Sequence, residues 1–331
     1  MLAMLSPFVA EFLLGDQYLA GLAGPPQQIV MFLMFMAFYG MAAVLIRELA
    51  RRLRIGWTGL LLVALGYGIF EEGLITQSLF NPHYIGLSLI EPGYVPGLGI
   101  GAPWTVFVIS LHVIWSIATP IAIIEAWYGR GDPGGRGTEP WLGRIGTIVC
   151  LVIFVLAAAA TAVFSIFSDA HHFVAPPARL AAAAVAAALA VIAGISLRGR
   201  LAAPAPSTLR GTVLSALFAA VATSALHVIH RLPGLSPWLD ALAMLAIWTA
   251  AVVIMRAWHM RGTGPVPFGL GVGAVITYAW VGMFPASRAG GAAVIEQVIL
   301  VIIVLALIGW TAVRSRRTVQ QHRQERSPAL H

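Results

Sequence analysis

The stretch from Gly66 to Pro82 carries the side chains best suited to acid–base chemistry. Two adjacent carboxyls, Glu71 and Glu72, lie there within a long apolar run. An acidic side chain in the middle of a bilayer costs about 2.5–3.5 kcal/mol on insertion scales, so it usually has a partner or a function. A buried carboxyl that exchanges its proton suits general acid–base catalysis or proton transport. The alternative is a structural pair that hydrogen-bonds to Trp, Tyr or backbone groups.

The two glutamates are neighbours, and this limits what they can face. Adjacent residues on an α-helix point about 100° apart. We therefore expect Glu71 and Glu72 to have different partners. One would face the centre of the bundle, and the other a neighbouring helix or the loop that follows.

Histidines gather at the level of these glutamates. His112 lies nine residues past Pro103, roughly 14 Å along a helix. We expect it to share a site with the glutamates, together with Tyr67, Trp115 and Ser116. Six of the nine histidines are expected on or near this side of the membrane: His83, His112, His171, His172, His227 and His230.

A divalent metal is one use for such histidines. His227 and His230 share a helix face at a spacing that can place two imidazoles on one ion. His171 and His172 are further candidate ligands, and His227 and His230 could alternatively belong to a substrate or proton site. The single cysteine, Cys150, makes a cysteine-based site improbable. No cofactor is otherwise predicted.

Composition assigns the chain to the membrane. Hydrophobic residues make up 59% and charged residues 10% of the sequence, whereas soluble domains carry about 25% charged residues. Every basic residue is an arginine, and the arginines cluster at the ends of apolar runs. We therefore predict an all-α integral membrane protein, multi-pass in the plasma (inner) membrane, whose partner is the lipid bilayer and which does not bind nucleic acid.

Nine apolar runs are long enough to cross a bilayer, given about 20 residues per crossing. They are Gln27–Ile46, Trp57–Gln77, Pro103–Trp127, Ile145–Phe167, Ala178–Leu197, Gly211–His230, Trp238–Trp258, Pro267–Phe284 and Ala292–Val313. The eighth run carries Gly269, Gly271 and Gly273, which permit close helix packing.

The arginines predict the orientation. Seventeen of the 20 fall in one set of connections, and Arg179, Arg231 and Arg288 fall in the other. The positive-inside rule then places the N-terminus outside and the C-terminus in the cytoplasm.

The chain divides into three parts. Residues 1–26 are predicted to form an interfacial or re-entrant segment, and residues 27–313 the transmembrane domain. A long outward loop at 77–102 is rich in Gly and Pro turn signals, and we expect it to pack over the bundle. Residues 314–331 form a basic cytoplasmic tail.

The pieces Tyr67-Gly-Ile-Phe-Glu71-Glu72 and His112-Val-Ile-Trp-Ser116 resemble the PrsW/CPBP group of intramembrane proteases. The resemblance covers three of the nine predicted spans. It implies that Glu71 or Glu72 activates water and that His112 assists. The chain departs from the CPBP pattern at Thr76, where that pattern has arginine.

Three functions remain open from the sequence. The first is a membrane-embedded hydrolase that uses Glu71, Glu72 and His112, with the outward loop as a cover. The second is a proton-coupled transporter or carrier that uses the same groups. The third is a non-enzymatic binding or accessory membrane protein. The substrate would be a small molecule, a lipid or a peptide.

Overall fold

The computed structural model describes residues 1–21, 24–129, 138–200, 208–261, 264 and 266–326. Within them, nine helices are long and apolar enough to cross a membrane. They are Pro26–Arg52, Trp57–Ile75, Ala102–Tyr128, Arg144–Ser168, Pro177–Ser196, Leu209–His230, Pro237–Met260, Pro267–Ala289 and Gly291–Arg314. These nine confirm the predicted helical bundle, and each overlaps one of the predicted runs.

Several spans are built from more than one helical element. The first half of the chain forms α1 (Leu2–Pro7), η1 (Phe8–Phe12), α2 (Asp16–Leu19), α3 (Pro25–Phe35), η2 (Met36–Gly40), α4 (Met41–Arg52), α5 (Trp57–Phe70), η3 (Glu71–Ile75), η4 (Tyr84–Gly86), β1 (Tyr94–Val95), β2 (Ile100–Gly101), α6 (Ala102–Leu111), η5 (His112–Ala118) and α7 (Thr119–Gly129). The second half forms α8 (Arg144–Ser168), α9 (Pro177–Ser196), α10 (Leu209–His230), α11 (Pro237–Met260), α12 (Pro267–Val281), α13 (Met283–Ala289) and α14 (Gly291–Arg326).

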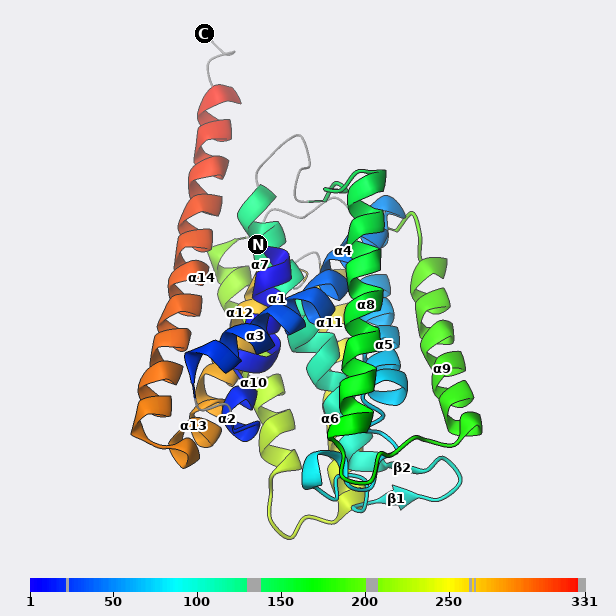
Figure 1. Cartoon of the computed structure of the whole chain (residues 1–331). Coiled ribbons are helices and arrows are strands. Elements are labelled where there is room, and N and C mark those ends of the chain that lie inside the picture. The colour runs from blue at the N-terminus through cyan, green and yellow to red at the C-terminus, as the bar shows by residue number, and fades with distance from the viewer. Residues whose placement is uncertain (22–23, 130–137, 201–207, 262–263, 265, 327–331) are drawn as a thin grey trace.

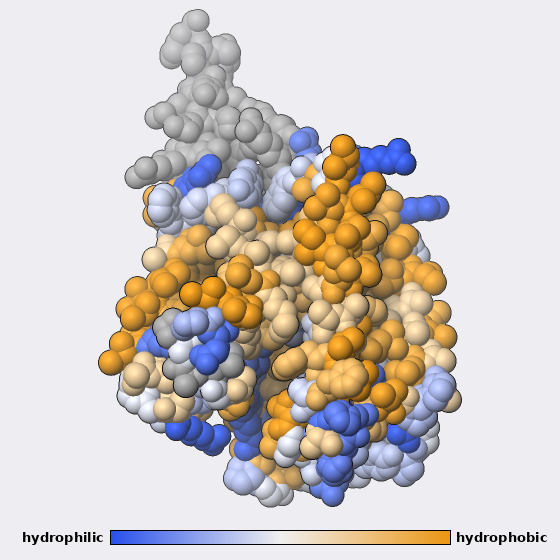
Figure 2. All heavy atoms as spheres, viewed as in Figure 1, coloured by the Kyte–Doolittle hydropathy of each residue, from blue (hydrophilic) through white to orange (hydrophobic). Residues whose placement is uncertain are grey.

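The span α6–η5–α7 is the central helix of the bundle (Figure 1). In the most apolar stretch of this span, 78% of the residues are buried. The corresponding share is 17% in each of the spans formed by α8, α9, α11 and α14. The face of the molecule seen in Figure 2 is accordingly covered largely by apolar side chains. This is the distribution expected when outer helices face lipid and one inner helix carries the polar groups.

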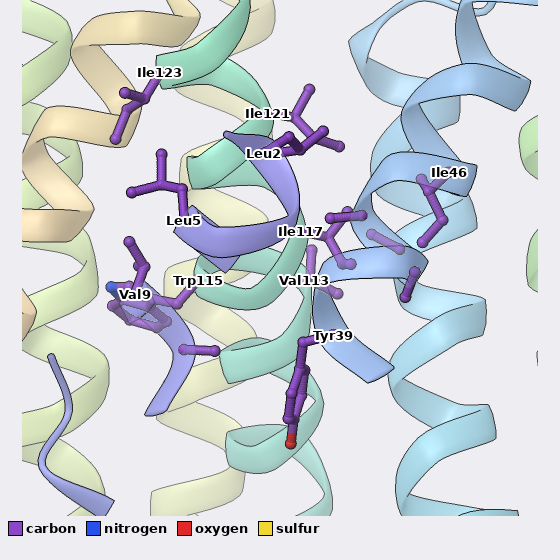
Figure 3. Packing of buried hydrophobic residues seen from close by; sticks show 14 of the residues in the cluster. Leu2, Leu5, Val9, Tyr39, Ile46, Val113, Trp115, Ile117, Ile121 and Ile123 are labelled. Carbon is purple, nitrogen blue, oxygen red and sulfur yellow. The ribbon is translucent and has the colours of Figure 1, made fainter. Parts of the chain in front are cut away.

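The N-terminal segment is not an outer element. Leu2, Leu5 and Val9 are buried, and they pack beside Ile117 and Trp115 of the central helix (Figure 3). Ser6 Oγ donates to the Ser116 carbonyl at 2.7 Å. Residues 2–12 therefore lie inside the bundle against η2 and η5.

The start of the chain lies at the arginine-rich end of the bundle. The Tyr128 hydroxyl, at the end of the central helix, donates to Met1 Sδ at 3.3 Å. From there the segment runs to the opposite end, where α2 contacts α13 (Figure 1). The first span itself begins at that opposite end, because Gln28 near its start donates to Glu296 near the start of α14. Orientation relative to the membrane stays a prediction.

Glycines bring two helix pairs unusually close. A Cβ added to Gly273 on α12 would lie 2.6 Å from the Ala220 amide nitrogen on α10, and one at Gly59 on α5 would lie 2.8 Å from the Gly194 carbonyl on α9. A real side chain at either place would push the helices apart. The predicted close packing of the eighth span is confirmed at Gly273.

The long loop begins where Gln77 ends the second span. Gln77 adopts a left-handed backbone conformation, with φ of 57°, which an α-helix cannot continue. Its side-chain oxygen accepts from the Ala175 amide at 2.7 Å, so it ties the α8–α9 connection to this turn. The loop then forms η4 and a two-stranded antiparallel hairpin of β1 and β2, whereas the sequence indicated only turns.

The opposite end of the bundle is held by buried charges. Arg51 on α4 makes two bonds to Glu125 on α7, Nε to Oε1 at 2.6 Å and Nη2 to Oε2 at 2.7 Å. Arg47 Nε adds a third at 3.1 Å. The Arg47 guanidinium also lies 3.2 Å from the centre of the Trp141 ring. Paired in this way, the charges join α4 to the central helix.

Replacing Glu125 with alanine should destabilise the bundle, because it removes the carboxylate that two buried guanidiniums share. We expect the free energy of unfolding to fall by about 3–5 kcal/mol, measured by denaturant titration in detergent micelles. Glu139→Ala, at an exposed position, is the matched control. Equal stability of the two variants would contradict the role given to this ion pair.

Candidate functional site

Four stretches of π-helix interrupt the described helices: η1, η2, η3 and η5. Each contributes a polar side chain to the same region. Glu11 lies in η1, Tyr39 in η2, the Glu71–Glu72 pair in η3, and His112 in η5. Short π-helical bulges are rare and occur often at functional sites. Their convergence marks this region as the candidate site.

The imidazole of His112 lies between the two glutamates. Its Nε2 is 2.6 Å from Glu72 Oε1, and its Nδ1 is 3.2 Å from Glu71 Oε2. The expectation that these neighbours face different partners is therefore wrong. Residues in the wider turn of η3 project at smaller angular steps than in an α-helix, and the two nitrogens lie on different edges of one ring.

Both carboxyl oxygens of Glu72 take part in hydrogen bonds. Besides His112, it accepts from the Thr76 hydroxyl at 3.0 Å and from the Ser78 hydroxyl, both at its Oε2. Trp104 Nε1 donates to Ser78 Oγ at 3.2 Å, which fixes that hydroxyl in turn. Such a set of donors stabilises an ionised carboxylate. Glu72 is thus suited to hold the His112 ring in place.

Glu71 differs from its neighbour. Its side chain is fully buried, and neither carboxyl oxygen has a partner with hydrogen-bond geometry in the described residues. Buried polar atoms without partners are rare, and a catalytic role is one of the reasons for which they occur. Of the two carboxyls, Glu71 is therefore the one free to react.

Aromatic rings enclose the imidazole. The Tyr39 ring stacks on His112 with centroids 5.9 Å apart, and the Tyr67 ring meets it edge-on at 6.1 Å. The Tyr39 hydroxyl points out of the apolar cluster around it (Figure 3). Both hydroxyls are close enough to Glu71 to interact with it electrostatically. The walls of the site are thus apolar rings with a few polar atoms.

The other expected site residues divide into two groups. Ser116 is at the site, since its hydroxyl lies 3.3 Å from His112 Nδ1. Trp115 points elsewhere, stacks on Tyr278 at 4.2 Å and contacts the His227 ring at 5.1 Å. His227 Nδ1 accepts from Arg231 at 2.7 Å. His227 therefore belongs to a second polar centre on the far side of Trp115.

The histidines proposed as metal ligands do not come together. His230 pairs with Asp240 at 3.0 Å. The ring of His171 packs on that of His83 at 4.8 Å, and His172 points to the Ile166 carbonyl. In the described part of the chain, none of His227, His230, His171 and His172 belongs to a group of three or more possible metal ligands, and a metal at these histidines stays a prediction.

Asn81, Asp169 and His171 form a separate polar cluster at the end of the bundle that carries the long loop. Asn81 Nδ2 donates to Asp169 Oδ2 at 2.6 Å. The backbone N–H of His171 donates to Asp169 Oδ1 at 2.9 Å and lowers the pKa of that carboxyl. These bonds join the start of the long loop to the α8–α9 connection.

One group in the described residues has the composition of a metal site, namely Glu71, Glu72 and His112, with ligand atoms within 4.8 Å of one another. However, Glu72 Oε1 and His112 Nε2 are at direct hydrogen-bond distance, 2.6 Å. Two ligands that share an ion at about 2.0–2.2 Å each lie farther apart than this. The arrangement as it stands therefore fits proton exchange better than metal ligation.

Sequence reasoning missed Tyr39, Thr76, Ser78 and Glu11 as parts of the site. An acidic residue in an otherwise apolar N-terminal stretch was the available signal for Glu11. Nothing in the sequence distinguishes Tyr39 from other core aromatics. Thr76 and Ser78 are placed by the turn at Gln77, which hydropathy does not reveal.

The two glutamates should respond differently to the same substitution. Glu72→Gln removes an acceptor of several charge-assisted hydrogen bonds and should lower the free energy of unfolding by about 3 kcal/mol. Glu71→Gln removes one charged contact, that with His112 Nδ1 at 3.2 Å, and should lower it by about 1 kcal/mol, less than Glu72→Gln does. Thermal unfolding of both variants in detergent, followed by circular dichroism, provides the comparison. Equal losses of unfolding free energy in the two variants would show that the hydrogen bonds of Glu72 do not stabilise the protein more than the contact of Glu71 does.

A model of an uncharacterised membrane protein family matches residues 1–319, and the chain belongs to that family. This match, with the nine apolar helices, establishes a multi-pass membrane protein; the plasma membrane in particular stays a prediction. No curated protein and no solved structure matches the chain. The family match gives no support to the resemblance to the PrsW/CPBP group.

Proposed function

We propose that the protein is a membrane-embedded hydrolase in which Glu71 and His112 activate water and Glu72 orients His112. One observation carries this proposal. The imidazole is bonded on one edge to a carboxylate that accepts several hydrogen bonds. On its other edge it lies 3.2 Å from a buried carboxyl for which the described residues supply no partner with hydrogen-bond geometry. An acid–base group held by an orienting group, next to a free reacting group, is the arrangement that catalysis by water requires.

The chemistry follows from these positions. Glu71 takes a proton from water as the water oxygen bonds to an acyl carbon of the substrate. His112 Nδ1 gives a proton to the leaving oxygen or nitrogen as its bond to that carbon breaks. The proton on Glu71 then returns to His112, whose Nδ1 lies 3.2 Å away. One water is consumed, and both side chains end as they began.

Access to the site favours a substrate that arrives from within the membrane. The side of the molecule shows a hollow between the part formed by α2 and α10 and the part formed by α8, with hydrophilic surface at its lower end (Figure 2). A hollow among apolar helices suits a lipid, or a peptide segment with an ester or amide bond. The long loop over this end would limit entry of bulk water.

A proton-coupled carrier is the second candidate, because of the N-terminal segment. A helix broken at Gly15, with φ of 91°, lies inside the bundle and carries Glu11 and Asp16. Broken helices with ionisable residues at the centre of a bundle are typical of carriers. In that case Glu71 and His112 would bind and release protons without hydrolysing a bond. An accessory protein with a purely structural site is the third candidate.

Hydrolysis in ¹⁸O-labelled water separates these candidates. We would incubate the purified protein with total lipid and peptide extracts of the membrane in which it is produced, and analyse the products by mass spectrometry. The wild type should release a product that carries one ¹⁸O atom. Glu71→Gln and His112→Asn should reduce its rate by about 10²–10⁴-fold, the usual contribution of a general acid or base. Glu139→Ala should leave the rate unchanged.

The contrary result is equally definite. If the wild type releases no more labelled product than Glu71→Gln, the hydrolase proposal fails. Proteoliposomes loaded with a pH-sensitive dye then test the carrier. Proton uptake that is lost in Glu71→Gln supports the carrier, and unchanged uptake in that variant leaves a structural role.

A further inference from the structure

Ser116 bonds differently from a typical serine within a helix. In a helix, a serine hydroxyl often donates to the carbonyl four residues earlier. Ser110 does this in the same span, at 2.6 Å from the Val106 carbonyl. In the part of the chain that the structure describes, the Ser116 hydroxyl instead bonds to a side chain, His112 Nδ1, at 3.3 Å. The hydroxyl of Ser116 is therefore paired with a base.

The bond between Glu72 and His112 leaves Nδ1 able to accept a proton. Glu72 Oε1 lies 2.6 Å from His112 Nε2, and an ionised carboxyl only accepts hydrogen bonds. The proton of a neutral His112 ring is therefore held on Nε2, and the lone pair of Nδ1 stays open. Ser116 can then donate its hydroxyl proton to Nδ1. Ser116, His112 and Glu72 thus form a series of nucleophile, base and orienting carboxylate.

Two groups lie next to His112 Nδ1. Ser116 Oγ is 3.3 Å and Glu71 Oε2 is 3.2 Å from this nitrogen. In the described residues, neither carboxyl oxygen of Glu71 has a partner with hydrogen-bond geometry, so the hydrogen bond to Nδ1 comes from Ser116. Glu71 lies beside the same edge of the ring and is left for a reaction with water.

The N-terminal segment holds Ser116 in place. Ser6 Oγ donates to the Ser116 carbonyl at 2.7 Å. Both serines are buried, with 0% of Ser6 and 3% of Ser116 exposed. A reacting group that is fixed in this way loses little freedom when it meets its substrate, which lowers the barrier to reaction.

We propose that Ser116 is a catalytic nucleophile, activated by His112 and Glu72, and that the hydrolase works through an ester of Ser116. His112 Nδ1 takes the proton of the Ser116 hydroxyl as Oγ bonds to the acyl carbon of the substrate. Nδ1 then gives this proton to the leaving oxygen or nitrogen as its bond to that carbon breaks. The acyl group is left as an ester on Ser116, and His112 is neutral again.

Water then releases the acyl group. Glu71 takes a proton from water as the water oxygen bonds to the ester carbon. Glu71 passes this proton to His112 Nδ1, 3.2 Å away, and Nδ1 gives it to Ser116 Oγ as the bond between that oxygen and the carbon breaks. One water is consumed, and all the side chains end as they began.

This inference rests on the proposed function for the hydrolysis itself and adds the covalent step. It also gives the two carboxyls separate tasks. Glu72 acts in both steps through His112, whereas Glu71 acts on water in the second step only. The substrates that fit this chemistry are esters and amides of carboxylic acids.

A long-chain alkyl fluorophosphonate tests Ser116 without any natural substrate. In this reaction the serine oxygen bonds to phosphorus, fluoride leaves, and the base takes the hydroxyl proton. The purified protein in lipid nanodiscs would be incubated with the reagent, and the labelled residue identified by mass spectrometry of its peptides. The wild type should carry one phosphonyl group, on Ser116, and Ser116→Ala none. His112→Asn should slow labelling by about 10²–10⁴-fold, the usual contribution of a general base.

Two controls accompany this measurement. Ser110→Ala removes a buried serine of the same span that bonds to a carbonyl and to Trp248, so it should be labelled like the wild type. Wild-type protein heated in SDS before the reagent is added should not be labelled, because the activation of Ser116 depends on the folded site. If His112→Asn fails to fold, as circular dichroism would show, the comparison of folded and heated protein decides the question.

The results distinguish the nucleophile from the proposed function. No label on Ser116 in the folded wild type, equal labelling of folded and heated protein, or labelling of folded His112→Asn at the wild-type rate overturns the nucleophile, even if Glu71→Gln abolishes the release of ¹⁸O-labelled product. Labelling of Ser116 that requires the folded site and His112 supports it, even if no ¹⁸O-labelled product is found in the extracts.

Discussion

An imidazole held between two carboxyls in an apolar interior is the constraint on which the rest of the structure depends. Charges inside a membrane protein are stable only when they are paired and their remaining hydrogen-bonding atoms are satisfied. Glu72 meets this condition through His112, Thr76 and Ser78. Glu71 lies 3.2 Å from His112 Nδ1, but among the described residues it has no partner with hydrogen-bond geometry. The site thus combines one stable and one reactive carboxyl on adjacent residues.

The surrounding helices are shaped to hold this arrangement. π-Helical turns at η1, η2, η3 and η5 direct side chains from separate segments to one place. The N-terminal segment fills the space beside the central helix, and the Arg51–Glu125 pair joins α4 to that helix at the far end. Lipid-facing helices such as α8 and α9 contribute few buried residues. Burial is therefore concentrated where the polar groups lie.

Hydropathy alone was sufficient to predict the nine spans, because each crossing needs about 20 apolar residues whatever its neighbours are. The grouping of Glu71, Glu72 and His112 was also predictable from their depth in the membrane. That both glutamates contact His112 could not be predicted, because an ideal α-helix places adjacent side chains about 100° apart. The sequence contains no signal for the π-helical turn that brings them together. Glu11 was missed because its segment is too short to span and its burial depends on tertiary packing.

The central claim is that one imidazole bridges Glu71 and Glu72, and dipolar coupling measures this most directly. In the protein labelled with ¹⁵N-histidine and ¹³C-glutamate and embedded in lipid, solid-state NMR would record couplings from both His112 ring nitrogens to glutamate carboxyl carbons. A bridging imidazole gives two couplings: one disappears in Glu71→Gln labelled in the same way, and the other disappears in Glu72→Gln. A single coupling, or two that both disappear in one variant, would contradict it.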